Sequence, residues 1–340
     1  MIFYDDTSIE DLCVHRIAEE DNESILNANA AGFAADKSGA LKTMFLKPFA
    51  NQVVTCEFAH EVDVKHNVLF NLARELNESG NFDQVSLKIA QHLVATSKHH
   101  NINEGDLFIA KFNDLYFNGD NYNALGIYKY EDKENFIETW VEGGRVNFKF
   151  RNGIGSKKPD KACLVIFTTV PYTLFIIEDR GGQTDYWQNE FVKHKPKNDF
   201  VNNTSDALTL TKEFITKQVP QEYQVTKTEQ IDLLNRSIDY FKTHSQYNKN
   251  EFEEAVFQDP GMIDAYRKYD NNYQKENALE IKDQFEISPM AVKKQNRVYK
   301  SVLKLDKNFH VYIHGNTDLI EKGTDKDGRK FYKIYYEEER

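Results

Sequence analysis

The chain has 340 residues, of which 40% are hydrophobic and 29% charged, and its formal net charge is −11. This length predicts two compact domains, each long enough to bury a core of its own, and the composition excludes a disordered chain. The acidic total excludes a protein that coats nucleic acid with its whole surface, so that any contact with phosphate must be local.

Three cysteines, Cys13, Cys56 and Cys163, lie far apart in apolar runs. This arrangement favours reduced, packed thiols over a disulfide framework. The N-terminus shows no basic stretch followed by a long apolar one, and no apolar window approaches the roughly 18 residues that a membrane-spanning helix needs. We therefore expect a cytoplasmic protein without a membrane segment.

Residues 1–180 combine helical and strand patterns. A strand pattern at 11–18 is followed by helical apolar spacing at 40–51, 67–77 and 82–97. Short apolar runs at hairpin-like spacing then follow at 107–112, 124–130, 136–141, 146–150, 162–169 and 173–178. These runs predict a largely antiparallel sheet.

Beyond residue 180 the patterns typical of strands end and helical patterns dominate. They fall at 186–192, 204–218, 227–243, 249–258 and 261–277, and the tail returns to strands at 309–314 and 331–336. The sequence thus predicts an α+β protein with two domains. The first, 1–180, contains an antiparallel sheet with helices, and the second, 181–340, is mainly helical and closed by a short β-hairpin.

The most informative segment, residues 288–305, predicts one basic amphipathic helix. Ser288 can cap its free amides, and Pro289 fits its first position. At about 100° per residue the apolar side chains share one side. This side holds Ala291, Val292, Val298, Tyr299, Val302 and Leu303, whereas Lys293, Arg297, Lys300 and Lys304 form a cationic stripe, with Lys294 beside it and Lys307 just beyond. Such a stripe is typical of a phosphate-binding surface, although the solvated face of an ordinary helix looks the same.

Charge is also segregated along the chain. Residues 286–340 carry twelve Lys or Arg against nine Asp or Glu, a balance of +3, so that residues 1–285 sum to −14. This distribution allows a focused contact with phosphates while the remainder keeps the molecule from wrapping nucleic acid non-specifically.

A second basic pattern lies at residues 145–151. Period-two alternation places Arg145, Lys149 and Arg151 on one face of a strand, together with Asn147, and Lys157 and Lys158 follow at once. This face could lie against a phosphate backbone. A charged edge strand that prevents aggregation would look the same, so both interpretations stay open.

Signatures of catalysis are weak. The segment 153–158 lacks the spacing of a phosphate-binding loop and predicts a hairpin loop, and 325–328 predicts a hairpin turn because Tyr336 replaces the glutamate that a calcium loop needs. His310 and His314 would be about 13 Å apart on a strand, too far for one metal ion. A nuclease-like site could form from four carboxylates, although their spacing in the sequence does not require it. These are Glu138, Asp160, Glu178 and Asp179. The sequence predicts no cofactor and no metal.

Five segments carry a resemblance to a known family. They are 12–17 (Leu-Cys-Val-His-Arg-Ile), 105–109, 124–128, 187–196 and 285–315. Over nearly its full length the chain resembles the bacterial nucleoid-associated protein family, in particular its Bacteroidetes-type members. The resemblance implies association with the nucleoid and favours the phosphate-binding interpretation of the basic helix. It implies no site residue by itself.

The resulting hypothesis is a non-enzymatic nucleoid-associated protein that binds DNA with little sequence specificity. The contacts would come from the cations of 293–307, with the 145–158 pattern as a secondary surface. One alternative is a protein interaction module that reaches the nucleoid through a partner, and another is a metal-dependent nucleic-acid-processing enzyme. The sequence leaves the protein partner and homo-oligomerisation open.

Overall fold

The computed structural model describes residues 2–18, 23–78, 80–97, 103–155, 157–178, 186–297, 299, 302–313 and 319–338. The chain forms two compact units, Met1–Lys197 and Asn198–Arg340, called unit 1 and unit 2 below. Each unit has its own buried apolar core.

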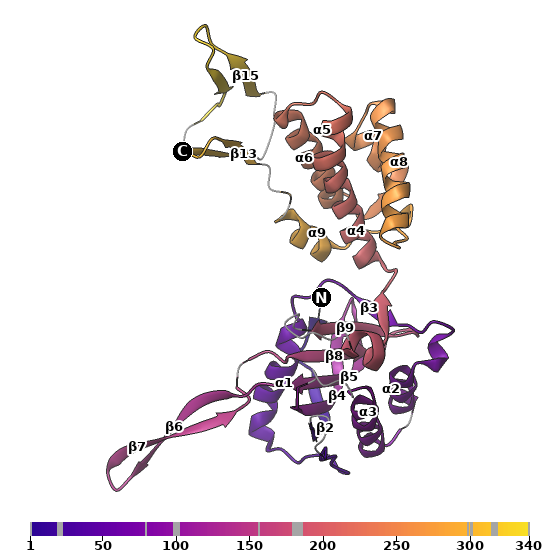
Figure 1. Cartoon of the computed structure of the whole chain (residues 1–340), viewed down its shortest axis with the longest axis vertical. Helices are drawn as coiled ribbons and strands as arrows, with labels where there is room; N and C mark the ends of the chain where they lie inside the picture. Colours follow the sequence, from indigo (N-terminus) through magenta and orange to yellow (C-terminus); the bar gives the residue numbers. More distant parts are fainter. Residues whose placement is uncertain are drawn as a thin grey trace. The chain divides into compact units, whose positions relative to one another are not determined.

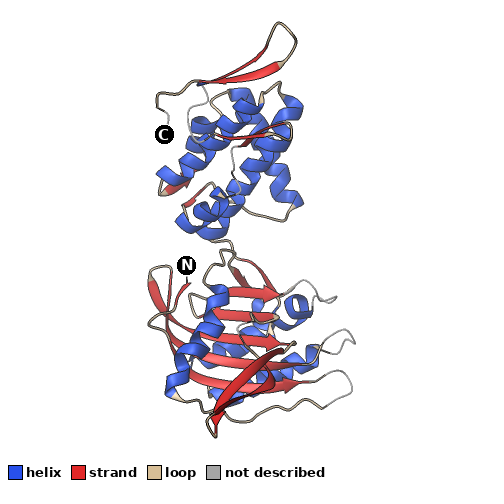
Figure 2. Ribbon diagram, turned by 90° about the vertical axis from the view of Figure 1, so that its left-hand side faces the viewer, coloured by secondary structure: helices blue, strands red, loops and turns tan. Residues whose placement is uncertain are grey.

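Unit 1 is built on an eight-stranded sheet in which neighbouring strands are antiparallel (Figure 2). The order is β1-β4-β5-β8-β9-β3-β10, and β2 also pairs with β4. The strands are β1 (Ile2–Phe3), β2 (Ser8–Ile17), β3 (Cys56–Phe58), β4 (Gly105–Phe117), β5 (Asp120–Tyr130), β8 (Lys161–Ile166), β9 (Thr173–Glu178) and β10 (His194–Pro196). The predicted antiparallel sheet is confirmed.

Helices cover both faces of this sheet (Figure 1). Because successive strand residues point to opposite faces, β4 sends Leu107 and Ile109 to one core and Ala110 and Phe112 to the other. The first core packs against α2 (Val68–Glu78) and α3 (Phe82–Thr96), and the second packs against α1 (Ser38–Leu46) and η2 (Lys47–Phe49). The short helices η1 (Ala35–Lys37) and η3 (Val64–His66) lie in the connections.

Two of the predicted strands leave the main sheet. Within the described residues, β6 (Glu134–Glu142) and β7 (Arg145–Gly153) pair only with each other, and they project from unit 1 as a two-stranded hairpin (Figure 1). We call residues 134–153 the arm. Its turn residues, Gly143 and Gly144, have φ of 59° and 74°, the left-handed values that a two-residue turn of type I′ requires at both positions.

Residues 186–197 belong to unit 1. Trp187, at the start of the π-helix η4 (Trp187–Val192), is buried in the first core, and β10 pairs with β3. The division between the units therefore falls at 197/198. This is downstream of residue 180, where the change from strand to helical patterns in the sequence predicts it.

Unit 2 is mainly helical and ends in two hairpins. Its helices are α4 (Phe200–Glu213), η5 (Phe214–Gln218), α5 (Val219–Glu222), α6 (Lys227–Thr243), α7 (Lys249–Val256), α8 (Pro260–Glu276) and α9 (Pro289–Asn296). A short ladder joins β11 (Gln246–Asn248) to β12 (Gln284–Glu286). The hairpins are β13 (Val302–Leu305) with β14 (Phe309–Tyr312), and β15 (Ile320–Thr324) with β16 (Lys330–Ile334). The predicted α+β class is confirmed.

The prediction of one basic helix over 288–305 is wrong. α9 ends at Asn296, and Val302–Leu305 forms a strand, so Lys304 lies on a strand rather than on a helix. The β-branched and apolar side chains at 302–305 suit a strand as well as a helix, and pairing with β14 decides between the two. Lys307 lies in the turn after β13, and Lys300 lies outside the described residues.

The thiols of Cys13, Cys56 and Cys163 are free and buried, as predicted. Within the described residues, no helix combines the length and the apolarity that crossing a bilayer requires.

Candidate nucleic-acid interface

α9 is fixed to the core of unit 2 by one side. The Ser288 hydroxyl accepts a hydrogen bond from the amide of Ala291 and caps the helix, as the sequence predicts. Ala291 and Val292 are buried, and the side-chain amide of Gln295 donates to the hydroxyl oxygens of Ser205, at 3.0 Å, and Thr209, at 3.1 Å, both on α4. These contacts determine which side of the helix meets solvent.

The solvent side of α9 is cationic. Lys293, Lys294 and Arg297 are exposed, and Lys293 and Arg297 are four residues apart, so that they lie on the same side of the helix. None of the three forms an ion pair with a described residue. Their charge is therefore available to a ligand.

The β13–β14 hairpin adds two further cations. Leu303 points inward and packs with Ile231 of α6 and with Ile313. Strand alternation then turns Lys304 outward, opposite the exposed His310, and Lys307 is exposed in the turn. The described members of the predicted stripe thus remain exposed in one unit, although they come from a helix, a strand and a turn.

We call the five described cations of this region the C-terminal basic surface: Lys293, Lys294, Arg297, Lys304 and Lys307. No ion pair joins them to any residue that the structure describes.

Sequence reasoning missed three other cations of unit 2. Lys322, Lys326 and Lys330, in and around the β15–β16 hairpin, are exposed, and within the described part of the chain none has an ion-pair partner. The +3 balance of residues 286–340 was the available signal. Asp325 and Asp327 lie among these lysines in the sequence and conceal the local excess of positive charge. In the structure both carboxylates pair with Arg329.

The arm confirms the predicted strand alternation but carries less available charge. Arg151 and Lys149 both bind the carboxylate of Glu138, at 2.7 and 3.2 Å, across the hairpin. These two cations hold the pKa of Glu138 below its usual value, with Arg151 as the larger cause. The charge of this face is therefore already partly balanced within the arm.

The cations at the base of the arm differ among themselves. Lys157 binds Asp160 at 2.9 Å and Asp132 at 3.2 Å, whereas Lys158 is exposed and forms no ion pair with a described residue. At the tip of the arm Arg145 is also exposed and unpaired within the described residues. Of the five predicted contacts in this secondary patch, only Arg145 and Lys158 have a charge that no described carboxylate balances.

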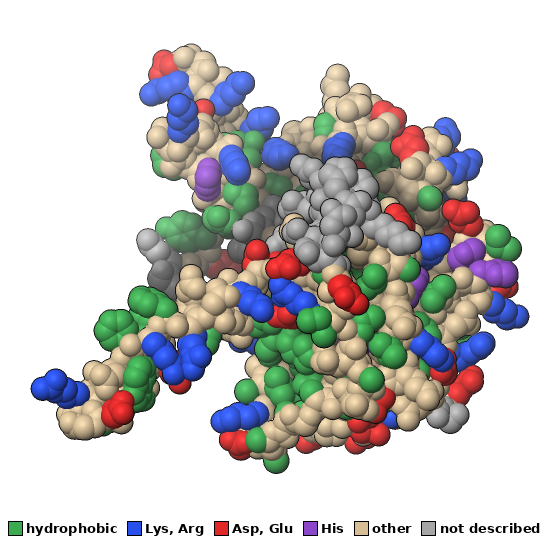
Figure 3. Space-filling view, turned by 60° about the horizontal axis from the view of Figure 1, so that its bottom comes forward, with side chains coloured by type: hydrophobic (Ala, Val, Ile, Leu, Met, Phe, Trp, Pro, Cys, Tyr) green, Lys and Arg blue, Asp and Glu red, His purple; other side chains and the backbone are tan. Residues whose placement is uncertain are grey.

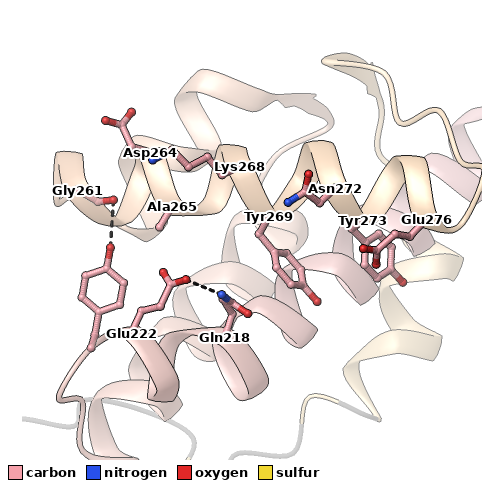
Figure 4. A pocket seen from close by; sticks show the side chains of 11 residues that line it. Gln218, Glu222, Gly261, Asp264, Ala265, Lys268, Tyr269, Asn272, Tyr273 and Glu276 are labelled. Atoms are coloured by element: carbon pink, nitrogen blue, oxygen red, sulfur yellow. Dashed lines mark hydrogen bonds between the residues drawn. The ribbon is translucent and has the colours of Figure 1, made fainter.

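A groove with a net negative charge lies between α5 and α8 (Figure 4). It has a volume of about 630 Å³, and its lining includes three carboxylates and one ammonium group. Tyr223 closes one end by donating a hydrogen bond to the carbonyl oxygen of Gly261 at 3.1 Å. The charged lining residues are Glu222, Asp264, Glu276 and Lys268. Phosphate would be repelled there, so this groove does not belong to a nucleic-acid interface.

The carboxylates considered for catalysis occupy separate elements. Glu138 lies in the arm, Glu178 ends β9, and Asp160 accepts hydrogen bonds from the backbone amides of Glu131 and Asp132. Asp179 and His314 lie outside the described residues. Across the described segments no group of three or more His, Cys, Asp or Glu is placed to hold a metal ion.

The segment 325–328 forms the predicted hairpin turn. One carboxylate oxygen of Asp325 accepts hydrogen bonds from the amides of Asp327, at 2.9 Å, and Arg329, at 2.8 Å, and Gly328 has a φ of 79°. The other carboxylate oxygen of Asp325 accepts a hydrogen bond from Nε of Arg329 at 3.0 Å, so both oxygens are engaged within the turn.

A family model described as nucleoid-associated protein YejK matches residues 13–329. The chain belongs to this family of nucleoid-associated proteins. Membership confirms the resemblance to the nucleoid-associated protein family and gives the protein a nucleoid-associated role in the bacterial cytoplasm. A comparison with curated proteins found no match.

Proposed function

We propose that this nucleoid-associated protein binds DNA through the C-terminal basic surface, with little sequence specificity and without catalytic turnover. The observation that carries the proposal is the set of five exposed cations that no described carboxylate neutralises. Family membership supplies the cellular setting.

The acidic charge of the rest of unit 2 supports a DNA contact that is limited to the C-terminal part of the unit. Residues 198–285 carry sixteen Asp or Glu against ten Lys or Arg, so the helices around the basic surface are acidic. An acidic surround repels phosphate, which limits the contact to a small area. Lys and Arg side chains that meet phosphates carry no base information, and this is why we propose weak specificity.

Salt dependence tests the proposal directly. Five neutralised phosphates give the logarithm of the binding constant a slope of about −4 to −5 against the logarithm of the salt concentration. We would measure the anisotropy of a labelled duplex of random sequence with the full chain, from low to above-physiological salt. A shallow slope contradicts direct binding through these cations.

A pair of charge-matched variants locates the contact. Lys293→Glu/Arg297→Glu reverses two cations on one side of α9 and should weaken binding at least about tenfold. The control, Lys268→Glu/Lys275→Glu, makes the same change of charge on α8, where both lysines are exposed. Equal losses in the two variants would mean that net charge, rather than the C-terminal basic surface, governs binding.

A protein interaction module is the second candidate. The acidic groove between α5 and α8 favours it, since a tyrosine-lined groove with three carboxylates suits a basic segment of another protein (Figure 4). Under this alternative the purified protein ignores DNA even at low salt, and the Lys268→Glu variant leaves its nucleoid association unchanged or strengthens it.

A further inference from the structure

The arm has one apolar face that no described residue covers. Partners in register share a face of an antiparallel pair, and Ile137 opposes Phe150 while Val141 opposes Val146. Phe148 lies between these pairs. The exposed fractions are 56% for Ile137, 73% for Val141, 74% for Val146, 64% for Phe148 and 71% for Phe150. Figure 3 shows exposed hydrophobic side chains, in green, along the projecting arm.

The size of this face calls for a partner. Five side chains with these exposures offer about 600 Å² of apolar surface, at the upper end of the largest patch found on typical monomers. A two-stranded ribbon is also marginally stable by itself in water and gains stability when one face is covered. The arm is therefore built to pack against something.

On the opposite face the charged side chains pair within the arm, and the two aromatic side chains, Phe136 and Trp140, are 47% and 38% exposed, less than any of the five on the apolar face. Glu138 binds Lys149 and Arg151, and the ammonium group of Lys149 lies 5.0 Å from the centre of the Trp140 ring. Trp140 donates a hydrogen bond to Glu142 at 3.2 Å. The partner thus meets the apolar face.

The charge of the arm favours a second copy of this chain as the partner. Residues 134–153 contain three Glu and three Lys or Arg, so the arm is neutral although the whole chain is at −11. Two arms can approach without the repulsion that other parts of two acidic molecules would meet. A strongly charged partner would find no complementary charge on this face.

The gradation of side-chain size along the face points the same way. Small side chains, Val141 and Val146, lie near the tip, and the larger Ile137 and Phe150 lie near the base. When two copies stack antiparallel, each small pair lies over a large pair, and Phe148 with Thr139 falls at the two-fold axis. This is the self-complementary surface that an isologous dimer requires.

We propose that the protein forms a homodimer in which the apolar faces of two arms pack antiparallel against each other. The stacked arms make a small β-sandwich, with its two ribbons about 10 Å apart. The contact buries about 1,200 Å² in total, at the lower end of specific interfaces, so the dimer dissociates in the micromolar range.

Sedimentation velocity of the full chain over a range of concentrations tests the proposal. Phe148→Asp places a carboxylate at the two-fold axis and should raise the dissociation constant of the dimer at least about tenfold. Asn147→Asp adds the same charge one residue away on the opposite face and should leave it unchanged. A monomer at all concentrations, or a dimer that Phe148→Asp leaves intact, overturns the proposal.

Two single-cysteine variants show whether a loss of the dimer reflects the contact itself or unfolding of the arm. The native cysteines are buried, so an added thiol is the reactive one. Phe148→Cys should yield a covalent dimer on mild oxidation, and Asn147→Cys should not. Equal cross-linking of both variants, or binding of the apolar face to lipid vesicles or another protein by a monomer, contradicts the dimer. DNA affinity is a separate readout, because the basic surface lies in unit 2.

Discussion

The hydroxyl of Tyr299 donates a hydrogen bond to the backbone carbonyl oxygen of Leu208, which lies 91 residues earlier in the chain. Both residues are buried, and the bond fastens Tyr299, which follows α9 in the chain, to α4. The C-terminal basic surface therefore depends on a packed aromatic residue between its helix and its strand, although that residue carries no charge.

Removing this hydroxyl should lower the stability of unit 2. Tyr299→Phe keeps the ring and loses the hydrogen bond, so we expect the free energy of unfolding to fall by about 1 kcal/mol. Urea unfolding followed by tyrosine fluorescence measures it. Tyr336→Phe, at an exposed position, is the control and should change the free energy by less than about 0.5 kcal/mol. No difference between the variants would show that the bond contributes nothing.

The two basic patches should differ in their effect on salt dependence. Lys293→Ala/Arg297→Ala removes two available cations and should reduce the slope by about 1.8. Lys149→Ala/Arg151→Ala removes cations that Glu138 already binds, so we expect a reduction below about 0.5. Anisotropy titrations with two unrelated duplexes give both slopes. A larger effect from the arm variant would make the arm the principal contact.

Acid should destabilise unit 1 through His15. Its Nδ1 accepts the amide of Asn27 at 3.1 Å, so the proton is on Nε2, which donates to the Ser86 hydroxyl at 2.9 Å. Burial lowers the pKa of His15 from 6.5 to about 4. The unfolded chain thus binds the extra proton first, and stability present above pH 6.5 is lost as the pH falls toward 4, by about 3 kcal/mol.

Urea midpoints between pH 7 and pH 4 measure this loss. His15→Gln removes the titrating group and should flatten the pH dependence over that range, whatever it does to stability at pH 7. A wild-type slope that persists unchanged in the variant would assign the acid sensitivity to other groups.

Asp206 should have the opposite effect on unit 2. Burial, and then the negative charge of Asp199, raises the pKa of Asp206 from 3.8 to about 6. The folded state binds the proton more tightly, so stability falls as the pH rises from about 4 to 6. Asp206→Asn should raise the free energy of unfolding at pH 7 by about 2–3 kcal/mol. Asp264→Asn, at an exposed position, is the control for loss of a charge. Equal effects of the two substitutions would contradict a raised pKa of Asp206, whose side chain is half-buried.

Much of the fold could be predicted from local pattern. The apolar spacing over 227–243 is long and regular and matches α6 residue for residue, and the alternation at 145–151 predicts which face of the arm is apolar. Ser288 caps α9 because its hydroxyl lies next to the free amides in the chain itself. These features depend on neighbours within a few residues, and such neighbours are always present.

Tertiary structure decided what depends on distant residues. Val302 and Leu303 fit an apolar stripe on a helix or alternate positions on a strand, and only β14 and Ile231 of α6 select the strand. The available charge of each cation is also non-local. Glu138 balances Lys149 and Arg151 across a hairpin, whereas the cations of the C-terminal basic surface meet no described carboxylate. The sequence determined where positive charge is concentrated, and folding determined which of those charges remain unbalanced, because ion pairing requires proximity in space.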